Sequence, residues 1–167
     1  MFSGCTNVLH LFMVSSNIRI LPEDLFNNLT NMVQLDLSGN IISILPGKIF
    51  SGLSQLNSLN LSSNNIETLY PDTFSTLTSL TYLSLSYNQM RKPHGLLLAN
   101  LTSLEFLDLS YNSIDNLTDT LFCCVPKLEY LYVSEKESIC FCILFYVFPP
   151  TSNSRRITAL PSQVDCG

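Results

Sequence analysis

The sequence has 167 residues, of which 46% are hydrophobic and 13% are charged, and its formal net charge is −5. This length and hydrophobic content suffice for one domain with a single substantial core. The negative charge argues against a protein that tracks nucleic-acid phosphates, because such proteins normally present a basic face. The longest apolar run, Ile139–Pro150, is shorter than the ~20 residues that a membrane-spanning helix requires. We therefore expect no membrane segment and no nucleic-acid partner.

Short apolar strands followed by an asparagine recur along the chain. The asparagines are separated by 23 residues at the first interval and by 24 at each later one: Asn17, Asn40, Asn64, Asn88 and Asn112. The apolar residues before them are Leu9, Phe12 and Val14; Met32, Leu35 and Leu37; Leu56, Leu59 and Leu61; Leu80, Leu83 and Leu85; and Leu104, Leu107 and Leu109. Such a period indicates stacked coils whose strands pair in a parallel sheet, about 4.8 Å apart, over one continuous core.

The repeated asparagines and phenylalanines have structural interpretations. An asparagine amide both donates and accepts, so each can satisfy buried main-chain groups in its own coil and in the next one, which builds a ladder. On the return side of the coils, aromatic residues recur at similar offsets, and Leu98 occupies the fourth place: Phe26, Phe50, Phe74 and Phe122. We interpret these phenylalanines as core rather than as a cofactor pocket.

The fourth coil departs from the pattern in its return segment. Met90–Leu97 contains Pro93 and concentrates Arg91, Lys92 and His94. This segment is either a cationic contact site or a solvated loop, and we favour the loop because loops are mobile and variable.

Catalytic and metal-binding motifs are missing from the sequence. The two histidines, His10 and His94, fall in different coils, and no paired zinc-ligand motif is present. No serine or cysteine has a histidine placed near it by the repeat, and no phosphate loop, carboxylate pair or dinucleotide fingerprint occurs. We therefore expect a protein that is not an enzyme and binds no cofactor or metal.

A change of pattern marks the end of the repeat. Leu128, Leu131 and Val133 form a sixth strand, but Lys136 stands where the next asparagine is due. The following segment is apolar and contains cysteines, as suits a cap over an open solenoid end: Cys140, Cys142 and Cys166. Here the chain resembles the C-terminal flank of extracellular leucine-rich repeat proteins, and its LPxxxF spacing and CxC motif are most similar to Toll-like receptor ectodomains and variable lymphocyte receptors.

This resemblance implies an α/β leucine-rich repeat solenoid, with a curved parallel sheet on its concave face and an irregular or short-helical convex side. Residues 1–8 would form an incomplete N-terminal cap, residues 9–136 five full coils and a terminal strand, and residues 137–167 the C-terminal cap. The family also implies that Cys140 or Cys142 pairs with Cys166. The other thiol is free or reaches back to Cys123 or Cys124.

Cys5 lies five coils from the cap, over 20 Å at about 4.8 Å per coil, beyond the ~7 Å limit between bridged Cα atoms. We expect an oxidising, extracellular setting, either secreted or in the ectodomain of a membrane receptor.

Four glycosylation sequons occur, at Asn28, Asn60, Asn100 and Asn116. Asn28, Asn100 and Asn116 map to return segments, whereas Asn60 points outward between Leu59 and Leu61. A glycan at Asn60 would obstruct the middle of the concave face.

The outward strand positions change character along the chain. They are small or polar in the first three coils, and from the fourth coil they become aromatic and acidic: Tyr82, Tyr87, Glu105, Phe106, Asp108, Tyr111, Glu129, Tyr130 and Tyr132. Aromatic residues suit strands in general, but tyrosines are also common in binding surfaces. We favour the binding interpretation, because these positions alternate away from the core.

Two functions fit these observations. The first is a non-catalytic extracellular recognition module that binds a protein or glycoconjugate on its concave face, as in innate-immune receptors, with a homodimer or a receptor partner implied by that family. The second is a structural or adhesive matrix protein that binds extracellular proteins without signalling.

Overall fold

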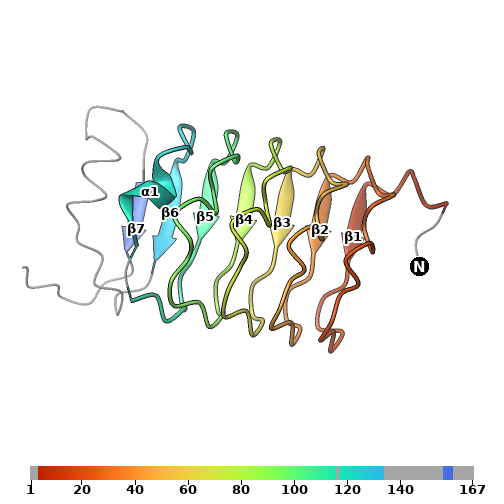
Figure 1. The fold of residues 1–167 in the computed structure, drawn as a ribbon, viewed down its shortest axis with the longest axis horizontal. Helices are drawn as coiled ribbons and strands as arrows, with labels where there is room; N and C mark the ends of the chain where they lie inside the picture. The colour runs from red at the N-terminus through yellow and green to blue at the C-terminus, as the bar shows by residue number, and fades with distance from the viewer. Residues whose placement is uncertain (1–3, 116, 134–155, 160–167) are drawn as a thin grey trace, which may run out of the picture.

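The computed structural model describes residues 4–115, 117–133 and 156–159, and in it the chain winds as a solenoid with one short strand per coil (Figure 1). The strands are β1 (His10–Phe12), β2 (Gln34–Asp36), β3 (Ser58–Asn60), β4 (Tyr82–Ser84), β5 (Phe106–Asp108), β6 (Tyr130–Val133) and β7 (Arg156–Ala159). They pair in parallel, in sequence order, in one seven-stranded sheet. The predicted parallel solenoid is therefore confirmed.

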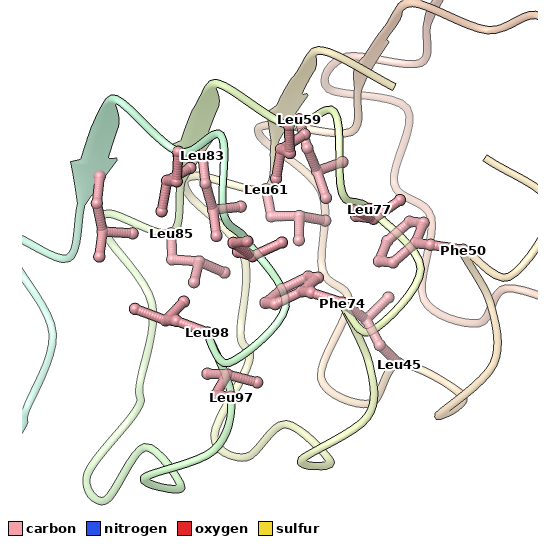
Figure 2. Packing of buried hydrophobic residues seen from close by; sticks show 14 of the residues in the cluster. Leu45, Phe50, Leu59, Leu61, Phe74, Leu77, Leu83, Leu85, Leu97 and Leu98 are labelled. Carbon is pink, nitrogen blue, oxygen red and sulfur yellow. The ribbon is translucent and has the colours of Figure 1, made fainter. Parts of the chain in front are cut away.

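The core is a ladder of leucines that stack in register. Leu35, Leu59, Leu83, Leu107 and Leu131 are direct partners across successive strands, and each is at most 1% exposed. Figure 2 shows Leu59 and Leu83 at the sheet, with Leu61 and Leu85 pointing into the same interior. Burying this apolar ladder is the main stabilising term of the fold.

Behind the leucines, stacked phenylalanines fill the return side of the coils. The ring centroids of Phe26 and Phe50 are 6.3 Å apart, and those of Phe50 and Phe74 are 6.0 Å apart. All three rings are fully buried, and Leu98, which takes the next place, is 1% exposed. Figure 2 shows Phe50, Phe74 and Leu98 in the same interior. These residues are core, as their recurrence predicts.

Four of the repeated asparagines bridge neighbouring coils through their side chains. Asn64 accepts from the Ile42 amide at 3.0 Å and donates to the carbonyls of Leu37 and Leu61 at 3.0 and 3.1 Å. Equivalent bonds are made by Asn40, Asn88 and Asn112. The partner coil is the preceding one, however, and not the following one that we expected from the sequence.

The first coil lies one residue out of the predicted register. β1 pairs Leu11 with Leu35 and Phe12 with Asp36, so Leu11 faces the core and Phe12 faces solvent. The predicted inward residues Leu9, Phe12 and Val14 are 49%, 59% and 45% exposed. A shift of one residue moves every side chain of a strand to the opposite face.

The residues that face the core in the first coil are instead Val8, Leu11 and Met13, which are partly buried. Ser16, 24 residues before Asn40, then occupies the ladder position, and its amide donates to the Asn40 side chain at 2.9 Å. Asn17 is exposed, has a φ of 54°, and does not belong to the ladder.

The return segments are irregular, as expected. They consist mostly of tight turns; in one of them the Ile49 amide donates to the Pro46 carbonyl at 3.1 Å. Within the described residues the one helix is α1 (Asp119–Phe122), which has four residues and is far too short to cross a bilayer.

The last strand was not indicated by the leucine pattern. β7 pairs in parallel with β6, with Leu131 opposite Ile157, and it lies in the segment for which the sequence predicts a cap. Strand pairing uses main-chain groups, so it can continue after the leucine and asparagine signature has ended. The predicted cap cysteines Cys140, Cys142 and Cys166 and the sequon at Asn116 lie outside the described residues.

Candidate binding surface on the outer face of the sheet

The outer face of the sheet, which points away from the leucine ladder, differs between its two halves. In β2 and β3 it carries Gln34, Asp36, Ser58 and Asn60, all of which are half-buried. In and just beyond β4, β5 and β6 six aromatic residues follow, which we call the aromatic patch: Tyr82, Tyr87, Phe106, Tyr111, Tyr130 and Tyr132. The register of the sheet brings these residues together from three consecutive coils.

Four members of the patch form one contiguous group centred on Phe106. Its ring stacks on Tyr82 with centroids 4.6 Å apart and an interplanar angle of 14°. On the other side it contacts Tyr132 at 5.2 Å and Tyr130 at 6.3 Å in tilted arrangements. The Tyr82–Phe106 distance is close to the spacing between strands, because the two residues are direct partners in the register.

The other two members, Tyr87 and Tyr111, form a separate pair just beyond the strands. Their rings stack with centroids 4.1 Å apart at 11°, and the side chains are 53% and 49% exposed. Both residues have positive φ, 53° and 54°, at a position where the second coil has Gly39. A bulky side chain is costly in this conformation. Neither burial nor backbone preference therefore explains tyrosine at these two positions.

The acidic residues of the predicted site differ in position, since Asp108 lies within the outer face and Glu105 and Glu129 lie at the ends of strands. Glu105 and Glu129 are exposed and directly precede β5 and β6. Asp108 lies on the outer face between Ser84 and Tyr132 in the register. Its Oδ1 accepts from the amide and the hydroxyl of Ser110, at 2.9 and 2.6 Å.

These surroundings shift the titration of two tyrosines. Partial burial, and next the charge of Asp108, raise the pKa of Tyr82, with Asp36 contributing in the same direction and a hydrogen bond with Ser84 opposing it. A hydrogen bond with Tyr111 is the largest cause that raises the pKa of Tyr87. Both phenols therefore stay neutral at physiological pH and keep their hydrogen-bonding protons.

Three serines of this surface were missed by the sequence reasoning. Ser84, Ser86 and Ser110 are 3%, 5% and 5% exposed, and the hydroxyls of Ser84 and Ser86 are 3.1 Å apart. For Ser86 and Ser110 the available signal was recurrence at the 24-residue period, since Ser38 and Ser62 occupy the same position in earlier coils; Ser84 has no such signal, because Asp36, Asn60 and Asp108 occupy its equivalent positions.

The sequons at described positions differ in how accessible their amides are. Asn28 is exposed. Asn100 is also exposed, but its Nδ2 donates to the Ser75 carbonyl at 3.1 Å. Asn60 is half-buried on the outer face, where its Nδ2 donates to Asp36 at 3.2 Å and its Oδ1 accepts from the Ser62 amide at 3.1 Å.

The adjacent cysteines of the fifth coil lie away from the patch. Cys123 and Cys124 are free thiols with their sulfurs 2.9 Å apart, and Cys5 is a free, exposed thiol at the other end of the chain. The hydrogen bond with Cys124 is the largest cause that raises the pKa of Cys123, which makes this thiol less nucleophilic at neutral pH.

A cavity elsewhere in the molecule is lined in part by the cationic segment of the fourth coil. This cavity of about 700 Å³ is lined by Glu67, Thr68, Gln89, Arg91, Lys92, Ser113 and Asp115. Its lining mixes acidic and basic groups and contains no aromatic anchor, so it is a weaker candidate for binding than the aromatic patch. The side chains of Arg91, Lys92 and His94 are exposed, in keeping with a solvated loop.

Sequence models of known families match two parts of this solenoid. Both are described as leucine-rich repeats, and they match residues 34–90 and residues 103–125. The chain is a leucine-rich repeat protein. Repeat domains of this kind are typically non-catalytic binding modules.

Solved leucine-rich repeat structures share this arrangement of coils. The leucine-rich repeat domain of APL1B is 32% identical with a TM-score of 0.70; the match covers 80% of this chain and 38% of that one. TLR13, in its complex with ssRNA13, is 30% identical with a TM-score of 0.66, over 74% of this chain and 21% of TLR13. The leucine-rich repeat domain of APL1 is 22% identical with a TM-score of 0.75, over 83% of this chain and 36% of that one, which shows the fold alone.

This leucine-rich repeat chain thus spans well under half the length of each of these structures. A comparison with curated protein sequences finds no match.

Proposed function

We propose that this leucine-rich repeat chain is an extracellular recognition module that binds a partner through the aromatic patch on the outer face of its sheet. The observation that carries the proposal is the pair Tyr87 and Tyr111. Both rings are about half exposed, and both sit at positive φ, so neither core packing nor chain geometry favours them. The two rings gain from stacking on each other and from their hydrogen bond, but about half of each side chain stays exposed, and exposed aromatic surface of this kind supports binding of a partner.

The stacked group around Phe106 supports the same surface. Cross-strand aromatic pairs also stabilise a sheet, by roughly 0.2–1 kcal/mol each, so this group alone would fit a purely structural role. Asp108 lies on the same outer face, opposite Ser84 and Tyr132 in the register, so this surface combines large apolar contacts with a negative charge, which supports binding of a protein partner.

The surface differs in charge from one suited to nucleic acid. The TLR13 structure holds an RNA, but strands β2 to β6 of this chain contain no lysine, arginine or histidine. A phosphate backbone requires basic side chains. The proposed partner is therefore a protein or glycoconjugate, and the extracellular setting rests on the likeness to the TLR13 and APL1B domains and on the exposed sequon at Asn28.

The experiment compares what the 167-residue chain and its variants capture from extracellular fluid. We expect partners of the wild-type chain to be lost when Tyr82, Phe106 and Tyr130 are all replaced by alanine. The matched control is Tyr70→Ala, which removes an aromatic ring that is 56% exposed and lies outside the patch. Circular dichroism should show the same fold for all three proteins. Equal capture by the triple variant and the control would refute the proposed surface.

A further inference from the structure

The aromatic patch ends abruptly on its N-terminal side, at the step between the third and fourth coils. The direct partner of Tyr82 in β3 is Ser58, and the residue 24 positions before Tyr87 is Ser63. Both serines are small, and Ser63 has the same positive φ, 54°, as the tyrosine positions that follow. The rings of the fourth coil therefore have no aromatic neighbour on this side.

The orientation of the rings determines what is presented at this step. The rings of Tyr82 and Phe106 are nearly parallel with centroids only 4.6 Å apart, and parallel rings this close must face each other rather than lie edge to edge. The same holds for Tyr87 and Tyr111 at 4.1 Å. One face of Tyr82 thus covers Phe106, and its opposite face looks along the solenoid over Ser58. We call this region the tyrosine step.

The floor of the tyrosine step is polar and acidic. Asn60 is half-buried in β3 and donates to Oδ2 of Asp36 at 3.2 Å, while Oδ1 of Asp36 accepts from the Ser38 amide at 2.9 Å. These bonds hold the carboxylate on the outer face of β2. A group seated above β3 would lie about one strand spacing, ~4.8 Å, from the Tyr82 ring on one side and from the Asp36 strand on the other.

The field at the tyrosine step favours a positive charge. Asp36 and Asp108 lie on opposite sides of Tyr82, and the charges of both act to raise its pKa, after the larger effect of burial. Cations bind over a tyrosine face within about 6 Å of its centroid, and a guanidinium group both stacks on aromatic rings and pairs with carboxylates.

We propose that the tyrosine step is a subsite for an arginine side chain of a basic polypeptide partner, stacked on the open face of Tyr82 and paired with Asp36. This inference rests on the proposed function and specifies its ligand. A neutral sugar would also stack on the ring and bond to Asn60, but it would gain nothing from the two carboxylates that flank Tyr82.

The test uses the full chain and defined probes. Fluorescence anisotropy at low ionic strength would measure binding of a labelled serine–glycine peptide that carries arginines, and of the same peptide with citrulline at each arginine. Citrulline keeps the planar shape but has no charge. We expect the citrulline peptide to bind roughly tenfold more weakly, and the arginine peptide to lose affinity as salt is added.

Two variants test the two groups that form the subsite, the ring of Tyr82 and the carboxylate of Asp36. Tyr82→Leu keeps an apolar side chain but removes the ring face, and Asp36→Asn removes the charge while keeping an oxygen for the Ser38 amide. Each should weaken binding of the arginine peptide several-fold, and Asp36→Asn should leave the weaker binding of the uncharged citrulline peptide unchanged. The matched controls, Tyr70→Leu and Asp72→Asn, alter exposed residues of a return segment and should have no effect.

The outcomes separate this inference from the function on which it rests. Equal binding of the arginine and citrulline peptides, or no loss in Asp36→Asn, would overturn the arginine subsite. So would Tyr82-dependent binding of a chitin trisaccharide in place of the arginine peptide. In each case the recognition surface still stands if the triple alanine variant loses its natural partners. If that variant retains them, the recognition surface fails.

Discussion

The two faces of the same sheet differ in how uniform their residue types are. On the inner face, five successive coils have leucine at the same position, from Leu35 to Leu131, and each is at most 1% exposed. On the outer face, one residue away, the same strands carry Asp36, Asn60, Ser84, Asp108 and Tyr132. The inner face must fill a constant space between coils, so its residue type is fixed by packing. The outer face has no such constraint, so its residues are free to vary from coil to coil, and the proposed binding surface lies where they are aromatic.

The largest expected effect is on the inner face. Leu83→Ala should reduce the free energy of unfolding by about 2–5 kcal/mol, because it leaves a cavity in the middle of the leucine ladder. Urea denaturation of the full chain would measure the loss. Leu96→Ala is the matched control, since this leucine is 55% exposed and its removal should cost less than about 0.5 kcal/mol. Similar losses in both variants would contradict the division between the faces.

The next largest loss in the free energy of unfolding is expected from the asparagine ladder, which lies where each coil turns away from its strand. Asn64→Ala should cost roughly 1–3 kcal/mol, because it leaves the buried Ile42 amide without its acceptor and removes one of the two bonds that the Leu37 carbonyl accepts. The control is Asn65→Ala at the exposed neighbouring position, which should be nearly neutral. Asn17→Gly should also be nearly neutral, since Asn17 is exposed and glycine accepts its positive φ. A neutral Asn64→Ala would show that the ladder adds no stability.

Most of the inner face was predictable from the sequence, for a physical reason. A constant spacing of the leucines implies coils of constant length, and such coils stack their strands into a parallel sheet. The same spacing buries the phenylalanines and gives the positions of Asn40, Asn64, Asn88 and Asn112. The direction of the asparagine bonds was not predictable, because an amide can serve a neighbour on either side equally well until the geometry of the turn is known.

The outer face was predictable as a list of residues but not as an arrangement. The alternation of side chains placed Tyr82, Phe106 and Tyr130 on one surface, and the register of the strands made them neighbours. Tyr82 has one covered face and one open face because of how its ring is oriented, and no sequence pattern predicts the orientation of a ring. The positive φ of Tyr87 and Tyr111 was likewise hidden, because serine, glycine and tyrosine all occupy that column.

In the first strand, the sequence does not show which residues face the core and which face solvent. His10–Val14 is largely apolar, so both registers bury hydrophobic residues, and Asn17 favoured the wrong one. The signal was the interval of 23 residues between Asn17 and Asn40, compared with 24 elsewhere. With the interval set to 24, Ser16 takes the ladder position and Leu11 aligns with Leu35.

A pair of substitutions in this strand tests the register with the smallest expected effects. Leu11→Ala should cost about 1–2 kcal/mol, less than a central leucine, because Leu11 is only partly buried at the end of the described sheet. Phe12→Ala should change stability by less than about 0.5 kcal/mol, since the ring is 59% exposed. The register expected from the sequence predicts the reverse order, because Phe12 would then be the core residue. Urea denaturation of the two variants thus decides which side chain of β1 belongs to the inner face, and a greater loss in Phe12→Ala would overturn the register described above.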